Sequence, residues 1–353
     1  MSSTTTTALD PHALRAAIDE EPFSGVVSVD VGDTPVWLTA HGLADRSSET
    51  PVTGSTRFAI ASGSKAFTAL AVMRLVEDGA LALGTTARSI LGTDLPLIDD
   101  AVTVEHLLGH TSGIGDYLDE DDGRELSEVF LEVPVHALTS AEAFLPLLDG
   151  IPAEAAPGET FAYSNSGYVL LAIVLERVTG RGYHDVVQDL VLDPAGLAGT
   201  GFPRTDELGS DHARGYVFDD GMRVNTLQLP VRGNGDGGAS TTAADVHRFW
   251  LALFEGRIVS TPTLARMIAP RSYDEDEGMR YGLGFWLNET GTPVALEGCD
   301  SGASFRSVHH PSTGTTATVL SNTAGGAWAV ARVLADAVAA LDEDESAPSP
   351  VSE

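Results

Sequence analysis

Apolar side chains dominate one long segment in the first quarter of the chain. Residues 66–76 are apolar except for Thr68 and Arg74, and Gly79 follows as a stop signal. The pattern predicts a helix over residues 62–78 that is apolar on nearly every face. A helix of this kind belongs in the core of a globular protein.

Other segments show helical or alternating spacing of apolar residues. Helical spacing occurs in residues 11–20, 104–108, 141–148, 168–178, 243–254 and 327–341. We expect Pro146 to kink or end the third of these helices. Strands are predicted over residues 25–30, 36–40, 282–287, 293–297, 304–309 and 315–320. The segment Gly32-Asp33-Thr34-Pro35 joins the first two strands and is typical of a hairpin.

Strands near both ends of the chain, with helices between them, predict an α+β fold with one sheet built from the two ends. We expect a single unit over residues 1–353. Its α/β part would comprise residues 11–60 and 280–341, and residues 61–279 would form a mainly helical part. The tails 1–9 and 342–353 are predicted to be disordered. The junction of the two parts is the natural place for a substrate cleft.

The predicted core helix begins with a Ser-x-x-Lys sequence. Ser62 and Lys65 lie three residues apart and therefore share one face of the helix. Burial lowers the pKa of a lysine, and a neutral amine can take the proton of a nearby serine hydroxyl. The start of a helix also offers backbone N–H groups where an oxyanion would form. This pair is our candidate nucleophile and base.

Lysine usage supports this interpretation. Lys65 is the only lysine in the chain, and the other basic residues are arginine or histidine. An arginine cannot give up its proton in a protein, whereas a desolvated lysine can. The alternative is chance, because Ser-x-x-Lys is a common tetrapeptide.

A second group of polar residues precedes the apolar segment 168–178. Tyr163 beside a cation can share its proton, and the amide of Asn165 can hold a substrate carbonyl. The competing interpretation is a helix start, with Ser164, Asn165 or Ser166 as the N-cap residue. Both can hold, since such a cap leaves Tyr163 available.

With these two motifs in order, the chain resembles the serine β-lactamase and penicillin-binding-protein superfamily. The similarity is greatest to its class C β-lactamase, D,D-peptidase and esterase branch. Residues 106–114, 237–245 and 281–285 resemble further landmarks of that branch, and the likeness spans about residues 24–341. The resemblance implies an antiparallel sheet flanked by helices. It also implies an acyl-enzyme mechanism in which Ser62 attacks, Lys65 and Tyr163 move the proton, and Asn165 positions the substrate.

The third motif of the family is altered here. Where relatives carry Lys-Thr-Gly or His-x-Gly on a strand lining the site, the best match is Asp300-Ser301-Gly302. The resemblance places these residues and Ala303 in substrate binding, with the Ala303 N–H joining that of Ser62 as the oxyanion hole. An acid in place of the cation disfavours anionic substrates.

Neighbouring motifs are given structural roles. His106 and His110 have the spacing of zinc ligands, but Leu107 stands where a metalloprotease carries glutamate. We therefore expect hydrogen-bonded structural histidines, with no metal and no cofactor. The glycine-rich segment 233–238 is expected to be a loop, because Asp236 would repel a pyrophosphate. Cys299, the only cysteine, is expected to be a packing residue.

Composition limits the surroundings of the protein. With 43% hydrophobic and 20% charged residues the chain is typical of a globular protein, and its net charge of −31 opposes nucleic acid and anionic membranes. The polar N-terminus has no signal-peptide pattern, so the expected location is the cytoplasm.

The expected function is that of a serine hydrolase acting on an ester, amide or peptide bond of a small-molecule substrate. Two alternatives stay open: a β-lactamase or D,D-carboxypeptidase, and an inactive homologue that binds a ligand. The sole lysine at the motif position argues against the inactive homologue. The substrate and the oligomeric state are left undetermined by the sequence.

Overall fold

The computed structural model describes residues 10–20, 23–118, 125–275, 278–288 and 292–346. Its α-helices are α2 (Pro11–Glu20), α3 (Lys65–Glu77), α4 (Ala87–Leu91), α5 (Val104–Leu108), α6 (Leu145–Leu148), α7 (Asn165–Thr179), α8 (Tyr183–Val187), α9 (Asp193–Ala195), α10 (Ala243–Phe254), α11 (Thr261–Met267) and α12 (Trp328–Ser346). Shorter helical turns are η1 (Ala61–Ser64), η2 (Leu126–Glu128), η3 (Val135–Ala137), η4 (Glu142–Phe144), η5 (Gln188–Leu192) and η6 (Asn225–Leu227).

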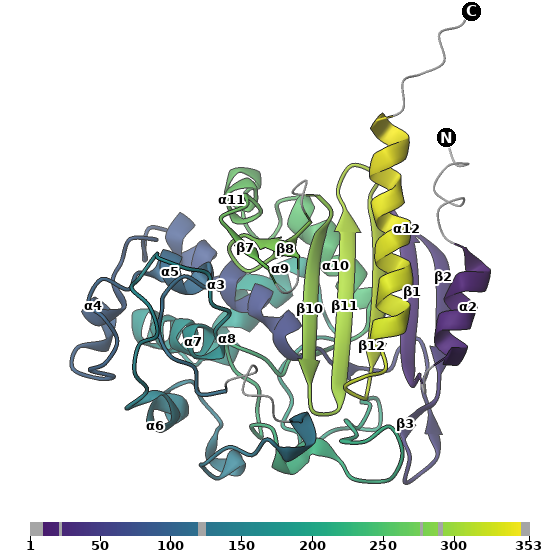
Figure 1. Ribbon diagram of the computed structural model, residues 1–353, viewed down its shortest axis with the longest axis horizontal. Coiled ribbons are helices and arrows are strands. Elements are labelled where there is room, and N and C mark those ends of the chain that lie inside the picture. Colours follow the sequence, from purple (N-terminus) through teal and green to yellow (C-terminus); the bar gives the residue numbers. More distant parts are fainter. Residues whose placement is uncertain (1–9, 21–22, 119–124, 276–277, 289–291, 347–353) are drawn as a thin grey trace, which may run out of the picture.

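An antiparallel sheet of eight strands forms one side of the molecule (Figure 1). Its order is β2-β1-β12-β11-β10-β9-β8-β7, so strands from both ends of the chain lie next to each other. The strands are β1 (Gly25–Val31), β2 (Thr34–His41), β7 (Ser272–Asp274), β8 (Met279–Tyr281), β9 (Trp286–Leu287), β10 (Val294–Asp300), β11 (Ala303–His310) and β12 (Thr315–Ser321). Two small pairs, β3 (Leu43–Asp45) with β4 (Thr50–Pro51) and β5 (Phe58–Ala59) with β6 (Ser240–Thr241), lie outside it. The predicted α+β fold and the sheet built from both ends are confirmed.

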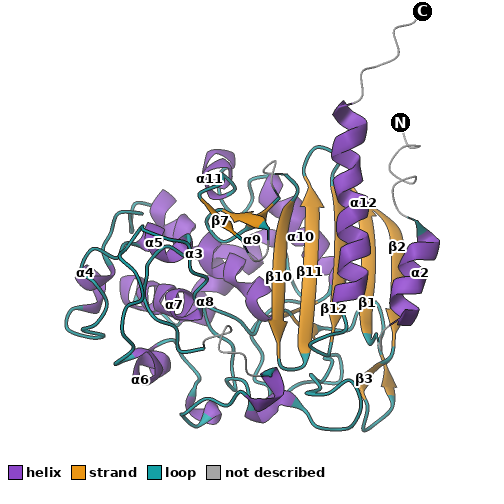
Figure 2. Cartoon of the chain, viewed as in Figure 1, coloured by secondary structure: helices purple, strands orange, loops and turns teal. Residues whose placement is uncertain are grey.

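Helices cover both faces of this sheet (Figure 2). One face packs against α2 and α12 through an apolar cluster that includes Leu14, Val27 and Leu334. Val26, the neighbour of Val27 in β1, instead belongs to the larger core shared with the helical region. Successive side chains of a strand point to opposite faces, so one strand serves both cores. Of the described helices, none combines the length and apolar character needed to cross a membrane.

The element predictions hold best where the pattern is long. Helices α2 and α10 coincide with the predicted residues, and the predicted hairpin is β1–β2, with Gly32 at φ +53° in its turn. Pro35 is accommodated in β2 because that strand is at the edge of the sheet, where a missing N–H breaks no ladder.

Three element predictions are wrong in detail. The predicted strand 282–287 is reduced to β9, because Gly284 takes a positive φ of +91° and residues 282–285 form a turn. The predicted helix 141–148 is divided into η4 and α6, with Pro146 in the first turn of α6, a position where its missing N–H is not needed. Helix α12 continues to Ser346, beyond the predicted start of the disordered tail at residue 342. Residues 1–9 and 347–353 lie outside the described residues.

Candidate active site

The candidate nucleophile sits on a turn under strain at the start of the core helix. Ala61 has a positive φ of +44°, which is unfavourable for a residue with a side chain. The following turn η1 carries Ser62 and leads directly into α3. Such outliers persist only where the surroundings impose them, and they cluster at functional sites. Ser62 is half-buried and lines the main cleft.

The lysine of the motif is held against this serine. Lys65 Nζ, on a side chain that is only 2% exposed, lies 2.9 Å from Ser62 Oγ. It also donates to Asn165 Oδ1 at 2.7 Å and to the backbone oxygen of Asp236 at 2.8 Å. The three contacts use all three donor positions of an ammonium. A neutral amine in the same place would instead accept the proton of the serine hydroxyl, which is the geometry a general base requires.

The next serine along the turn has a different role. Ser64 is fully buried, donates to the Ala61 oxygen at 2.7 Å and accepts the Ala239 N–H at 2.9 Å. The first bond closes the strained turn, and the second ties it to the segment before β6. Ser64 is therefore a structural residue of the turn.

The tyrosine and asparagine predicted from the second motif lie beside the lysine. The Tyr163 ring centroid is 4.8 Å from Lys65 Nζ, and the ring stacks between His110 at 4.3 Å and Trp286 at 5.9 Å. Asn165 is the first residue of α7, and Ser164 is its N-cap, accepting the Gly167 N–H. The capping interpretation and the proximity of both motif residues to Lys65 are thus compatible.

His110 stacks against the ring of Tyr163. Its Nδ1 accepts the Ser164 N–H at 3.0 Å, so in the neutral ring the proton is on Nε2. Burial, with the Lys65 charge as a smaller cause, lowers the pKa of His110 well below its usual value. His106 Nδ1 accepts the Thr103 N–H at 3.3 Å in a capping box at the start of α5. The prediction that both histidines are hydrogen-bonded structural residues is confirmed.

A buried carboxylate that we did not single out from the sequence anchors the second motif. Asp116 accepts the backbone N–H groups of Asn165 at 2.5 Å and Ser166 at 3.1 Å, at the start of α7, where a negative charge is favourable. Burial raises its pKa from 3.8 to about 6, against the lowering effect of these hydrogen bonds. The neighbouring Tyr117 donates to Asp236 Oδ2 at 2.5 Å, and burial together with that carboxylate raises the pKa of Tyr117 well above 10.

The raised pKa of Asp116 predicts a pH-dependent difference in stability. A carboxyl whose pKa is higher in the folded than in the unfolded protein destabilises the fold as it ionises, from about pH 4 up to about pH 6. Replacing Asp116 by Asn removes this penalty. We therefore expect the free energy of unfolding of Asp116→Asn, relative to wild type, to rise by about 1 kcal/mol between pH 5 and pH 7.

Urea unfolding at four pH values in that range measures the difference. The lower limit of pH 5 keeps the protein above its isoelectric point near 4.4. Asp19→Asn, an exposed change on α2, is the charge-matched control. An Asp116→Asn curve parallel to wild type would contradict the raised pKa.

Strand β10 approaches the nucleophile through a glycine. A Cβ on Gly298 would lie 2.7 Å from the Ser62 nitrogen and 2.2 Å from the Ile60 oxygen, so only glycine allows this approach. The register pairs Asp300 with Ala303 across the two-residue turn Ser301-Gly302, where Gly302 has φ +77°. Residues that flank such a turn exchange hydrogen bonds with each other.

This register corrects the predicted oxyanion hole. Because Ala303 bonds to Asp300 within the hairpin, its N–H faces the hairpin and not Ser62. Hydrogen-bonding direction alternates along a strand, so the Cys299 N–H points to the open edge of β10, beside the Ser62 nitrogen. The register therefore makes Cys299, and not Ala303, the candidate second donor beside the Ser62 N–H. Cys299 is also exposed and lines the cleft, so its assignment as a packing residue is wrong.

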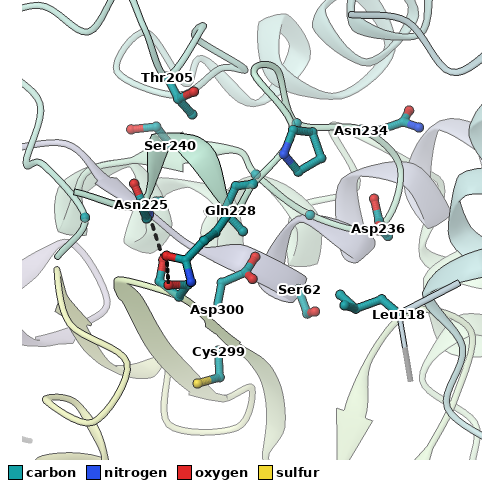
Figure 3. A pocket seen from close by; sticks show the side chains of 18 of the residues that line it. Ser62, Leu118, Thr205, Asn225, Gln228, Asn234, Asp236, Ser240, Cys299 and Asp300 are labelled. Atoms are coloured by element: carbon teal, nitrogen blue, oxygen red, sulfur yellow. Dashed lines mark hydrogen bonds between the residues drawn. The ribbon is translucent and has the colours of Figure 1, made fainter. Parts of the chain in front are cut away.

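The other residues of the third motif divide between cleft and support. Figure 3 shows the Asp300 side chain directed toward Ser62, in the place predicted for an acid. Ser301 is 4% exposed; its hydroxyl donates to Gln228 Oε1 at 3.0 Å and its oxygen accepts Asn225 Nδ2 at 2.7 Å. Gly302 packs against the backbone of Gly215, where a Cβ would not fit. Ser301 thus both lines the cleft and holds the turn, while Gly302 and Ala303 hold the turn in place.

Segment 233–238 was expected to be a loop, and it also lies against the candidate nucleophile and lysine. It contacts α3 through Gly235, whose oxygen accepts Thr68 Oγ1 at 2.7 Å, and through the Asp236 oxygen that holds Lys65. Repeated glycines in a family landmark were the available signal, since they indicate close backbone approach. The described residues include no group of three or more His, Cys, Asp or Glu arranged to hold a metal ion.

A lysine held on a serine at the first turn of a buried helix, beside such a sheet, is typical of the β-lactamase-related serine hydrolases. The chain belongs to the beta-lactamase family, whose model matches residues 13–341. This is the family that the resemblance implied.

Individual relatives carry several activities. Penicillin-binding protein 4* of Bacillus subtilis (strain 168) is 29% identical over 289 residues, covering 77% of this chain and 61% of the relative. Esterase EstB of Burkholderia gladioli is 34% identical over 219 residues, covering 55% and 53%. The crystal structure of a penicillin binding protein from Bacillus halodurans superposes with a TM-score of 0.83 at 33% identity, covering 94% of this chain and 99% of that one. The chain thus spans about half to two thirds of the length of these two curated relatives.

Proposed function

We propose that this protein hydrolyses an ester or amide bond of a small substrate through an acyl-enzyme on Ser62, with a preference for substrates that carry no negative charge. The observation that carries the proposal is the 2.9 Å contact between Lys65 Nζ and Ser62 Oγ beside two convergent backbone donors. An inactive homologue would have no need to keep a strained turn and a buried lysine in this arrangement.

The reaction proceeds in two halves. Lys65 accepts the Ser62 proton as Oγ attacks the carbonyl carbon, and the N–H groups of Ser62 and Cys299 stabilise the oxyanion. The tetrahedral intermediate expels the leaving group, which takes a proton from Lys65 by way of Tyr163. Water then attacks the acyl-enzyme with the same groups acting in reverse, and Ser62 regains its proton.

The charge of the cleft supports the substrate preference. Asp236 and Asp300 line it near the nucleophile, and no lysine or arginine is among its described lining residues. A substrate carboxylate there would meet like charges at close range, at a cost of about 1 kcal/mol or more. Penicillins and peptides with a free carboxylate are therefore expected to be poor substrates, although penicillin-binding relatives keep this second candidate open.

A turnover screen tests the proposal. We expect the wild type to hydrolyse 4-nitrophenyl esters and amino acid amides with higher kcat/KM than nitrocefin or penicillin G. Asp300→Asn should raise kcat/KM for the anionic substrates by about fivefold or more, because it removes the like charge, with little gain for neutral esters. Asp19→Asn, on the far side of the sheet, changes the net charge equally and should leave the ratio unchanged. Efficient penicillin hydrolysis that is insensitive to Asp300→Asn would establish the β-lactamase alternative instead.

A further inference from the structure

The cleft that contains Ser62 extends well beyond the reacting groups. Its lining runs from Ala59 and Ser62 to Thr205 and Leu208, so it offers room beside the reacting groups for more than an acetyl group. Near Ser62 its lining is polar, with Asn165, Asp236 and Asp300. Farther along, the lining is mostly apolar and comes from several separate segments: Leu126, Val129, Leu131, Leu208, Leu229 and Pro230.

These aliphatic side chains differ from those of the protein core. Leu126, Val129, Leu208 and Leu229 are half-buried, and none of them packs into either apolar core. Their remaining apolar surface faces the cleft. Apolar surface gathered in a concavity next to a nucleophile is typical of a substrate subsite.

Leu126, Val129, Leu208 and Leu229 form an apolar wall of the cleft. Gln228 connects this wall to the turn that follows β10. Gln228 is 4% exposed; its Nε2 donates to the oxygens of Leu126 at 3.1 Å and Ser127 at 2.9 Å, and its Oε1 accepts the Ser301 hydroxyl. One buried amide thus connects the turn after β10 with η2 and with Leu229. A wall fixed before the substrate arrives loses little entropy on binding.

The position of the wall indicates which part of a substrate it faces. Tyr163 stacks on Trp286, and strand β9 containing Trp286 pairs with β10 at Val294–Ala295, the start of that strand. The cleft instead continues past Asp300 at the other end of β10, and in Figure 3 Thr205 and Asn225 lie on the far side of Gln228 from Ser62. Because the leaving group must reach the proton held by Lys65 and Tyr163, the acyl group occupies the cleft.

We propose that Leu126, Val129, Leu208 and Leu229 form an acyl-binding subsite that selects substrates with an extended, uncharged apolar acyl group over acetyl compounds. This inference rests on the proposed acyl-enzyme chemistry. The subsite takes a linear or aryl-substituted chain of several carbons, and the carboxylates near Ser62 exclude acyl groups with an acidic substituent.

The test is a series of 4-nitrophenyl acetate, butanoate and hexanoate, with kcat/KM measured below the solubility limit of each ester. Burying a methylene favours binding by a factor of about three to four, so the hexanoate to acetate ratio for the wild type should exceed about ten. Leu229→Asn and Leu208→Asn should each lower that ratio at least threefold. The intrinsic reactivity of each ester cancels in the comparison between variants.

Leu227 provides the matched control. It is 74% exposed, lies two residues before Leu229 and does not line the cleft, so Leu227→Asn should keep the wild-type ratio. A wild-type ratio near one, or a ratio that survives both Leu229→Asn and Leu208→Asn, would overturn the subsite. Using two positions from separate segments guards against one variant failing to fold, and circular dichroism identifies such a variant.

Failure of the subsite and failure of the proposed function give different results. Hydrolysis of the acetate without any dependence on chain length refutes the subsite alone. Absence of hydrolysis of all three esters, together with no labelling of Ser62 by a fluorophosphonate, refutes the chemistry. In that case the subsite is decided by the binding of hexanamide and acetamide to Ser62→Ala protein, measured by saturation-transfer NMR. Equal binding of the two amides overturns the subsite. A preference for hexanamide that is lost in Ser62→Ala/Leu229→Asn supports it.

Discussion

Ser62→Ala is expected to remove turnover of every substrate, by at least about a thousandfold, and to prevent covalent labelling by a fluorophosphonate. Ser62 Oγ is the atom next to Lys65 Nζ and faces the cleft, so no acyl-enzyme can form without it. Mass spectrometry of the intact protein should show one added label for the wild type and none for the variant.

Ser64→Ala is the matched control, two residues away in the same turn. Ser64 is fully buried, and both bonds of its hydroxyl are to backbone groups, so the variant should lose about 1–3 kcal/mol of stability and still be labelled. Labelling that persists in Ser62→Ala and disappears in Ser64→Ala would assign the nucleophile to Ser64 and contradict the mechanism.

Lys65→Arg is expected to lower kcat by about a hundredfold to ten-thousandfold. The substitution keeps the positive charge beside Ser62 and Asn165, but a guanidinium cannot accept the serine proton. Stopped-flow measurement of the first turnover should locate the loss in acylation.

Lys65→Met separates proton transfer from charge. Both variants lack the base, so both should be slow; a fast Lys65→Arg with a slow Lys65→Met would mean that Lys65 acts through its charge alone. Tyr163, whose ring lies 4.8 Å from Lys65 Nζ, would then be the base to test by Tyr163→Phe.

Separation along the chain decided which contacts of the candidate site could be predicted from the sequence. Ser62 and Lys65 lie on one helical segment, so their contact follows from helix geometry and three-residue spacing. Asn165 reached the site through the family resemblance, since nothing local in the sequence brings it to Lys65 across a hundred residues. The position of Asp300 in the cleft followed from the same resemblance.

The second backbone donor beside Ser62 could not be predicted from the sequence. Choosing between Ala303 and Cys299 depends on strand register, and a shift of one residue reverses the direction in which an N–H points. The side chains around 298–303 carry no pattern that sets this register; the two-residue turn and the contact of Gly298 with Ser62 set it.

The sequence by itself determined the α+β class, most of the helices and the Ser62–Lys65 pair, because these depend on periodicity and on residues close together in the chain. The family followed from the resemblance of two separate motifs to those of known proteins. Tertiary structure alone decided that the Asp236 oxygen holds Lys65, that Asp116 anchors Asn165, and that Cys299 points its N–H at the site. It also decided the apolar wall of the cleft, which gathers single side chains from segments far apart in the chain. Each of these depends on backbone groups or isolated side chains meeting in space, for which an amino-acid sequence carries no local periodic signal.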